Sequence, residues 1–434
     1  MADDGSGGQP LHIRGHWWVL ALISVVIAGN YYAWDSIAPV ADLLRRQRGF
    51  SQSQIGMLNA VYALPNIPLS LVGGILIDRI GAARASLIAA AFCFVGAVLT
   101  AIGDPYGLMV FGRLVFGIGE ETLFISLLAG VAQWFGGGGA ALAMALFFSM
   151  ARVGSYAADI SPRWAANIYA GGWRPPLELT AALTGISLLA AVLYLWIDRF
   201  RPVAAGSAAN ADIAAATGHG RFNWRDLTTF DRSFWYIMGL NVLFASVFFP
   251  FRSTFAIEFF QDAKGLSLAD AGTVNSWVFF AAIFATPVFG LIADRIGRRA
   301  MLLTVGAALM PMTFAILGLT HWSLWISTAL MGLSFSVIPA VIWPSTATLV
   351  EPRRLGTAFG LINVLQSLGM GALNLAAGWL NDMTKAGPHN PAGYGPMLLM
   401  FFLFSLGGFV AVAALWRRES GPNGHGLNAV APGR

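Results

Sequence analysis

The chain has 434 residues, of which 57% are hydrophobic and 11% are charged, and its formal net charge is +5. Soluble domains carry about 25% charged residues, and no single core could bury this much apolar surface, so a soluble protein is excluded. The only cysteine, Cys93, excludes an intrachain disulfide and argues against a cysteine-based metal site.

Twelve mostly apolar stretches are long enough to cross a bilayer, for which a helix needs about 20 residues. They are 17–40, 53–77, 85–103, 107–134, 140–167, 177–197, 232–258, 268–292, 300–319, 323–349, 356–380 and 396–416. A polar segment rich in Gly, Ser, Ala and Asn separates the first six from the last six and predicts a linker. We therefore expect an all-α integral membrane protein with twelve transmembrane helices in two pseudo-symmetric six-helix bundles.

This pattern predicts five segments in chain order. They are an N-terminal tail (1–16), a six-helix bundle (17–198), a linker (199–231), a second six-helix bundle (232–418) and a C-terminal tail (419–434). Both tails are rich in Gly or Pro and are expected to be disordered.

Basic residues indicate the orientation of the chain, because cytoplasmic loops carry an excess of Lys and Arg. With both tails and the linker in the cytoplasm, that side holds 16 of the 26 basic residues and the other side holds 7. We therefore expect cytoplasmic termini. The main disagreement is a basic cluster on the other side, at Arg45, Arg46 and Arg48.

One short motif occurs twice, nearly half the chain apart. Gly74-x-x-x-Asp78-Arg79-Ile80-Gly81 ends the second stretch, and Gly290-x-x-x-Asp294-Arg295-Ile296-Gly297 ends the eighth. Two six-helix halves with a shared motif predict a pseudo-twofold transporter whose site lies between the halves.

This repeated motif resembles the signature of the major facilitator superfamily. The second copy is the fuller one, because Arg298 and Arg299 follow it, whereas Ala82 and Ala83 replace the usual basic pair in the first. The resemblance covers nearly the whole chain and implies alternating access by two rocking bundles. It also implies a gating role for Asp78, Arg79, Asp294, Arg295 and Arg298, as salt bridges that hold one state and break in the other.

Three further segments resemble the branch of this superfamily that contains the animal lysosomal dipeptide transporter. They are residues 112–122, residues 149–155 and Trp343-Pro344 with 355–360. This resemblance implies transport of short peptides and maps the acidic and basic substrate-contacting pair onto Glu121 and Arg152. Gly119-Glu120 also resembles the branch that transports sugar acids with a cation, so that alternative stays open.

Charged residues inside membrane spans are costly and normally face a partner or a wet cavity. Glu121 and Arg152 enter from opposite faces at depths of about 21 Å and about 18 Å, near the middle of a core roughly 30 Å thick. A glutamate and an arginine at matched depth suit the ammonium and the carboxylate of a zwitterion. The alternative is a structural salt bridge between neighbouring helices.

Helical geometry separates the roles of two adjacent glutamates, Glu120 and Glu121, which point about 100° apart. Arg113 shares a face with Glu120, so we expect Arg113 to be the charge partner of Glu120 and Glu121 to face the substrate, although the roles could be exchanged. Proton coupling through Glu120, Glu121 or Asp35 is also open, because desolvation favours a protonated carboxyl.

Polar and aromatic stripes mark the other candidate substrate-binding residues. The fifth span carries Ser149, Arg152, Tyr156 and Asp159 on one face, and the eleventh carries Asn363, Gln366, Ser367, Met370 and Asn374. Further candidates are Asn30, Tyr32 and Asp35 beside Tyr31 and Trp34 in the first span, together with Tyr62 and Trp343. Asp35 could instead be an exposed mouth residue or a partner of Arg113. Arg252 is expected near the outer water, with a binding role in the cavity as the alternative.

The sequence contains no nucleophile–base constellation, no phosphate-binding loop and no metal-ligand spacing. We therefore expect a transporter and not an enzyme, with no metal and no cofactor. The expected substrate is a small zwitterion, first of all a dipeptide; the alternatives are proton-coupled transport of small organic anions or sugar acids and, remotely, a non-transporting receptor. We further expect a monomer in a bacterial cytoplasmic (inner) membrane, with the lipid bilayer and the substrate as its partners and no nucleic acid.

Overall fold

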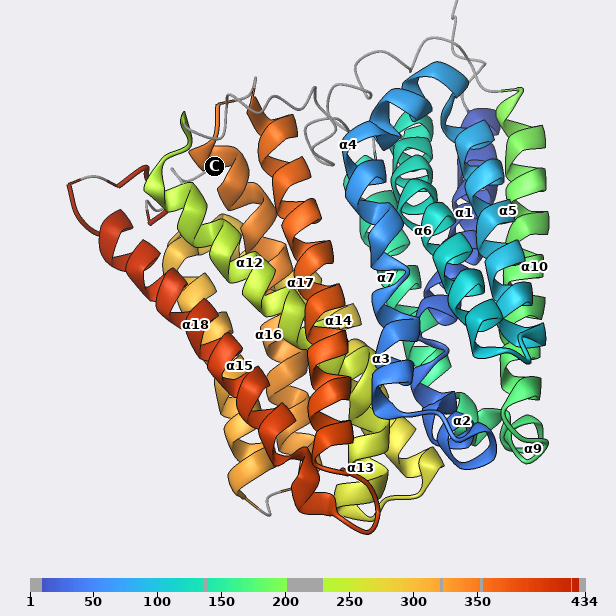
Figure 1. The fold of residues 1–434 in the computed structure, drawn as a ribbon. Coiled ribbons are helices and arrows are strands. Elements are labelled where there is room, and N and C mark those ends of the chain that lie inside the picture. Colours follow the sequence, from blue (N-terminus) through green and yellow to red (C-terminus); the bar gives the residue numbers. More distant parts are fainter. Residues whose placement is uncertain are drawn as a thin grey trace, which may run out of the picture.

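The computed structural model describes residues 10–135, 139–200, 229–320, 323–351, 354–422 and 424–428. Two helical bundles lie side by side (Figure 1). The N-terminal bundle contains α1 (Pro10–Asp35), α2 (Ala41–Arg48), α3 (Gln52–Ala60), α4 (Ala63–Ile80), α5 (Ala82–Ile102), α6 (Tyr106–Phe135), α7 (Ala140–Asp159), α8 (Ser161–Trp164), α9 (Ala166–Tyr169) and α10 (Arg174–Asp198). The C-terminal bundle contains α12 (Arg232–Pro250), a π-helical turn (Phe251–Phe255), α13 (Ala256–Lys264), α14 (Leu268–Ile296), α15 (Arg299–Leu319), α16 (Leu324–Leu349), α17 (Leu355–Met383), the 3-10 turn η6 (Pro391–Tyr394) and α18 (Gly395–Glu419).

Ten helical segments in the described part of the chain are long and apolar enough to cross a membrane. The two other predicted stretches correspond to α3 with α4, which are separated at Val61 and Tyr62, and to α7. The first predicted stretch, 17–40, and the fifth, 140–167, extend too far, because the helices end at Asp35 and Asp159. In both cases a proline follows within a few residues and starts a new short turn, since proline cannot continue a hydrogen-bonded helix.

The repeated motif of the sequence is a repeated corner of the fold. α4 ends at Ile80 and α14 ends at Ile296, and the glycine after each takes a positive φ, +87° at Gly81 and +68° at Gly297. Only glycine adopts such a conformation without strain. Of the predicted gating residues, Arg79, Arg295 and Arg298 are exposed, whereas the side chains of Asp78 and Asp294 lie outside the described part.

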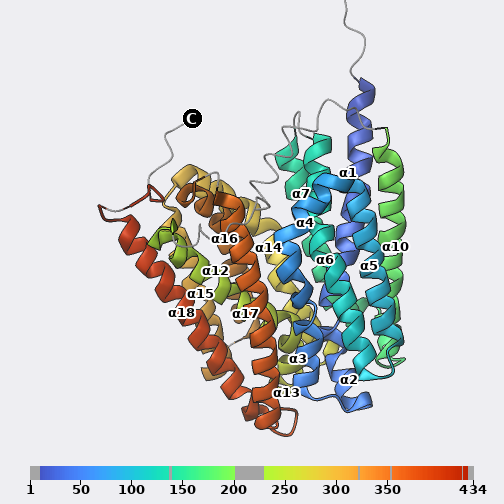
Figure 2. The same cartoon turned by 45° about the horizontal axis from the view of Figure 1, so that its top comes forward.

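The bundles meet most closely at the end that holds α2, α3 and α13, which we call the α13 end (Figures 1 and 2). α1 begins and α18 ends at the opposite end, which we call the tail end. Between the bundles, α17 packs against α3 and α4, and α14 packs against α7 and α8. The Asp382 carboxylate at the end of α17 caps α3 by accepting hydrogen bonds from the backbone N–H groups of Gln52 (2.8 Å) and Ser53 (2.8 Å).

The basic cluster Arg45, Arg46 and Arg48, which the orientation argument placed outside the cytoplasm, forms ion pairs at the α13 end. Each arginine reaches a carboxylate: Arg45 contacts Glu258 and Asp262, Arg46 contacts Asp42, and Arg48 contacts Asp104. In the loop before α6, the hydrogen bond from Arg48 and the charge of Arg174 hold the pKa of Asp104 below its ordinary value. The cluster therefore has a structural role, and the pairs of Arg45 join the two bundles.

Part of the C-terminal tail is packed, so the expectation of disorder is wrong for residues 424–428. Leu427 is buried in the core of the C-terminal bundle, and its carbonyl accepts a hydrogen bond from the backbone N–H of Arg299 (2.8 Å). His425 donates its backbone N–H to the Glu419 carboxylate (2.7 Å). Residues 1–9, most of the predicted linker (201–228) and residues 429–434 lie outside the described part.

The packing of α7 against α1 gives the first testable prediction. A Cβ at Gly154 would lie 2.1 Å from the carbonyl oxygen of Ala28, whereas a Cβ at Gly290 would meet nothing within 4 Å. Overpacking at a rigid backbone contact costs about 1–3 kcal/mol. We therefore expect Gly154→Ala to lower the melting temperature of the purified protein and Gly290→Ala to leave it unchanged or raise it. Equal melting temperatures for the two variants would contradict this packing.

Candidate functional site

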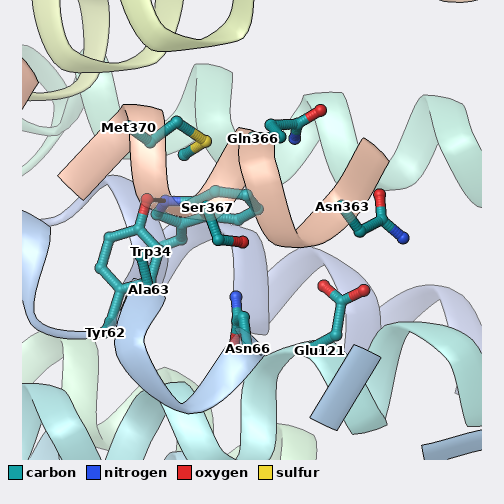
Figure 3. Close-up of a pocket in the computed structure, with 9 residues that line it drawn as sticks. All are labelled: Trp34, Tyr62, Ala63, Asn66, Glu121, Asn363, Gln366, Ser367 and Met370. Carbon is teal, nitrogen blue, oxygen red and sulfur yellow. Dashed lines mark hydrogen bonds between the residues drawn. The ribbon is translucent and has the colours of Figure 1, made fainter. Parts of the chain in front are cut away.

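A small cavity lies between the two bundles (Figure 3). Its lining comes from α1, α4 and α6 of the N-terminal bundle, from the break between α3 and α4, and from α17 of the C-terminal bundle. The lining residues are Trp34, Tyr62, Ala63, Asn66, Glu121, Asn363, Gln366, Ser367 and Met370.

The aromatic wall of the cavity joins the bundles. Trp34 donates its indole N–H to the hydroxyl of Tyr62 (2.6 Å) and stacks on Phe249 of α12, with ring centroids 5.7 Å apart. Tyr62 occupies the break between α3 and α4, and Trp34 is the second-last residue of α1. Both rings are therefore placed by helix ends.

Glu121 is the one ionisable carboxylate in the cavity lining, and it is half-buried. Its carboxylate points toward α17, which carries Asn363 and Gln366 (Figure 3). It makes no hydrogen bond or ion pair with any residue that the structure describes. The Gln366 side-chain oxygen accepts a hydrogen bond from Asn241 of α12 (2.8 Å), which fixes the amide of Gln366 at the opposite wall.

Arg152 of α7 is a second membrane-embedded charge that makes no hydrogen bond or ion pair with the residues that the structure describes. Its guanidinium lies over the ring of Phe335 at 4.5 Å and near that of Phe279 at 5.4 Å, which partly compensates the charge. The hydroxyl of Tyr31 lies within electrostatic range of both Arg152 and Glu121. Tyr31 thus lies near both charges, although Arg152 does not line the cavity itself.

The other two charged residues of α6, Arg113 and Glu120, have hydrogen-bond partners. Arg113 is buried and donates to the carbonyls of Ala33 (3.1 Å), Trp34 (3.2 Å) and Leu58 (3.1 Å). Helix C-termini leave carbonyls without intrahelical partners, and Arg113 fills this need at the ends of α1 and α3. Arg113 and Glu120 lie within electrostatic range of each other but make no direct ion pair. Glu120 accepts a hydrogen bond from Asn66 (3.2 Å).

The structure also corrects the expectations for Asp35 and Arg252. Arg252 is fully buried and does not reach the outer water, because it forms ion pairs with Asp35 (2.5 Å) and with Asp159. Asp35 is buried as well, so it is neither an exposed mouth residue nor a direct ion-pair partner of Arg113. These three residues form a charged cluster between the bundles.

Four further predicted residues lie away from the cavity lining. Tyr32 is buried near Trp164, with ring centroids 6.4 Å apart. Tyr156 packs on Phe280 and Trp343 packs on Phe359. Asn30 is buried, and its amide has no hydrogen-bond partner in the described part of the chain.

Six of the nine lining residues belong to the predicted binding residues or to the predicted α17 stripe, and the other three were not predicted to bind substrate. Tyr62, Glu121, Asn363 and Gln366 line the cavity, as do Ser367 and Met370 of the same α17 stripe. Asn66, Ala63 and Trp34 were not among the selected binding residues. Asn66 lies one helical turn after Tyr62, and this spacing is the signal that could have indicated it.

Comparison with known proteins identifies the family. The family model described as Major Facilitator Superfamily matches residues 23–372 and 241–432. The chain belongs to the major facilitator superfamily. This family consists of membrane transporters, so the chain is a transporter and not an enzyme.

Proteins similar to this chain are named for different substrates. The human lysosomal dipeptide transporter MFSD1 is 29% identical over 388 residues, which are 86% of this chain and 82% of that protein. The probable sulfoacetate transporter SauU of Cupriavidus necator is 24% identical over 375 residues, covering 81% of this chain and 84% of that protein. The probable nitrate/nitrite transporter NarK2 of Mycobacterium tuberculosis is 28% identical over 311 residues, covering 70% and 73%.

Two solved structures share the fold at low sequence identity. A bacterial homologue of the human lysosomal transporter Spinster, in an inward-facing and unoccupied conformation, has a TM-score of 0.69 at 15% identity and covers 95% of this chain and 97% of its own. A mutant of the nucleoside transporter NupG has a TM-score of 0.68 at 13% identity, covering 92% and 99%. They support the fold alone.

The different surroundings of Arg113 and Arg152 give a second prediction. Removing Arg113 takes the donor away from the carbonyls of Trp34 and Leu58, and each unsatisfied buried group costs about 1–3 kcal/mol. The Ala33 carbonyl keeps the hydroxyl of Ser36 as a donor (2.8 Å). We expect Arg113→Leu to lower the melting temperature of the purified protein strongly, whereas Arg152→Gln keeps it near that of the unmodified chain. A stronger loss in Arg152→Gln would show that Arg152 is the structural arginine.

Proposed function

We propose that the chain transports dipeptides, or closely related small zwitterions, across a membrane by alternating access. The observation that carries this proposal is the contrast among the membrane-embedded charges. Arg113, Glu120 and Arg252 have hydrogen-bond or ionic partners, whereas the described residues provide none for Glu121 and Arg152. Charges held unpaired in a span are expensive and are expected to serve a ligand.

The chemistry of the site suits the ends of a dipeptide. The Glu121 carboxylate would accept hydrogen bonds from the substrate ammonium, and the Arg152 guanidinium would donate two parallel bonds to its carboxylate. The amides of Asn363 and Gln366 can bond a peptide unit from the opposite bundle without selecting a side chain. Trp34 and Tyr62 offer apolar area for the side chains.

The similar proteins favour dipeptides as the substrate class and small organic anions as a second candidate. The MFSD1 proteins named as dipeptide transporters match 86% of the chain in human and cattle. The similarity to a probable sulfoacetate transporter favours small organic anions as the second candidate, with Arg152 holding the anion and Glu121 or Glu120 carrying a proton. The zwitterion comes first because its two ends would contact both Glu121 and Arg152, whereas an anion would contact Arg152 alone.

Several further features belong to the same proposal. The tail end faces the cytoplasm of a bacterial inner membrane, the protein works as a monomer, and its two bundles move as the segments 17–198 and 232–418. At the tail end, Asp78, Arg79, Asp294, Arg295 and Arg298 form the gate.

Ligand ranking tests the proposed substrate class directly. We expect dipeptides to raise the melting temperature of the purified protein, because ligands that bind only the folded state stabilise it. Free amino acids and sugar acids are expected to have little effect, because they lack the peptide unit or the ammonium. Stabilisation by sulfonates or sugar acids without stabilisation by dipeptides would support the second candidate.

Neutral variants of the two charges test the assigned contacts. Glu121→Gln and Arg152→Gln should each weaken dipeptide binding by roughly tenfold or more, because a charge-assisted hydrogen bond contributes about 1.5–3 kcal/mol. Binding is measured by calorimetry, and Glu178→Gln on the exposed face of α10 is the matched control. Unchanged affinity in both variants, with the protein folded, would contradict the assignment.

A further inference from the structure

The charged cluster between the bundles has an arrangement that the substrate site does not explain. Arg252 comes from the C-terminal bundle, whereas Asp35 and Asp159 come from the N-terminal bundle. All three side chains are buried, with exposures of 0%, 4% and 0%. The cluster is therefore a buried ionic contact between the two parts that must separate in alternating access.

Helix ends strengthen the attraction for Arg252. Asp35 is the last residue of α1, and Asp159 is the last residue of α7. A helix C-terminus carries a partial negative charge, so an acidic residue there is unfavourable without a cation. Two carboxylates and two negative helix ends thus converge on one guanidinium.

The C-terminal bundle presents Arg252 on a specialised piece of backbone. The residue lies in the π-helical turn Phe251–Phe255, directly after Pro250. Such turns are rare and occur frequently at functional sites. The guanidinium rests 3.9 Å from the centre of the Phe279 ring, and the Arg252 carbonyl accepts a hydrogen bond from Asn275 (3.1 Å).

The cluster is adjacent to the substrate cavity on both bundles. Asp35 follows Trp34, which lines the cavity, and Arg252 lies three residues after Phe249, on which Trp34 stacks. Arg152 lies within electrostatic range of both Asp35 and Arg252. The end of α1 and the segment after Phe249 are therefore shared by the cavity wall and the cluster.

We infer that Arg252, held by Asp35 and Asp159, is the ionic lock that keeps the cavity closed toward the α13 end. Opening toward that end requires Arg252 to leave both carboxylates, since they belong to the other bundle. This lock is distinct from the repeated Asp-Arg-Ile-Gly corners at the tail end. It rests on the proposed transport function, but it concerns the opening of the site and not the identity of the substrate.

An exposed ion pair between the bundles provides a matched control, whereas the pairs of Arg45 with Glu258 and Asp262 stay intact in all variants. Arg163 of α8 contacts Asp270 of α14 at 2.9 Å, and both side chains are more than half exposed. Exposed pairs contribute little, because water and salt screen them, whereas an uncompensated buried charge is strongly unfavourable. Loss of Arg163 should therefore not affect the opening of the α13 end.

The experiment measures the distance between the bundles at the α13 end by electron–electron double resonance. Spin labels are placed at the exposed positions Ala166 and His389 of the full chain, with the buried Cys93 replaced by alanine. We expect Arg252→Met to raise the ratio of long to short distances by about tenfold or more, because two buried carboxylates lose their cation. Arg163→Gln should leave the ratio within about twofold of the unmodified chain, as expected for an exposed pair.

Two milder variants cover the case in which Arg252→Met does not fold. Asp35→Asn and Asp159→Asn each leave one carboxylate on Arg252 and are expected to give ratios between those of the unmodified chain and of Arg252→Met. Distances in these variants that match the Arg163→Gln control would overturn the lock. No substrate is present in the measurement, so a failure of dipeptide binding would not alter this result.

Discussion

The structure depends on how a membrane-embedded helical bundle compensates charge. An ionised group inside a bilayer costs several kcal/mol unless a partner or water compensates it. Arg113 meets this requirement with the carbonyls at the ends of α1 and α3, and Arg252 meets it with two carboxylates of the opposite bundle. Glu121 and Arg152 have no such partner in the described part of the chain, and the cavity next to Glu121 is why we propose that these two charges serve a substrate.

Helix ends connect the substrate cavity with the contact between the bundles. The end of α1 places Trp34 in the cavity wall and Asp35 in the charged cluster, and its free carbonyls hold Arg113. One segment thus serves the site, the contact with the C-terminal bundle and the packing of α6. In the proposed mechanism, this shared helix end couples occupancy of the cavity to its opening.

The sequence predicted what depends on local patterns. Apolar stretches of about 20 residues located the spans, and the repeated motif with its glycines located two equivalent corners. The polar stripe of α17 was visible because Asn363 and Gln366 recur at helical spacing on one helix. Glu121 was separated from Glu120 by the same argument.

Contacts between distant segments could not be predicted from such patterns. The pairing of Arg252 with Asp35 and Asp159 depends on how two bundles dock, which no spacing within one helix contains. Arg113 was assigned to Glu120 because helical spacing shows neighbours on the same helix and not the free carbonyls of other helix ends. The helix ends at Asp35 and Asp159 were also placed too late, because apolar composition continues past the prolines that end each helix.

The most direct test of the account combines substrate modification with residue substitution in a thermodynamic cycle. Calorimetry compares a dipeptide with its N-acetylated form on the unmodified chain and on Glu121→Gln, and with its C-terminal amide on the unmodified chain and on Arg152→Gln. If Glu121 holds the ammonium and Arg152 holds the carboxylate, each modification weakens binding to the unmodified chain and has little further effect on the matching variant. Additive losses in both cycles would contradict the account, because they would show that neither charge contacts the end of the substrate assigned to it.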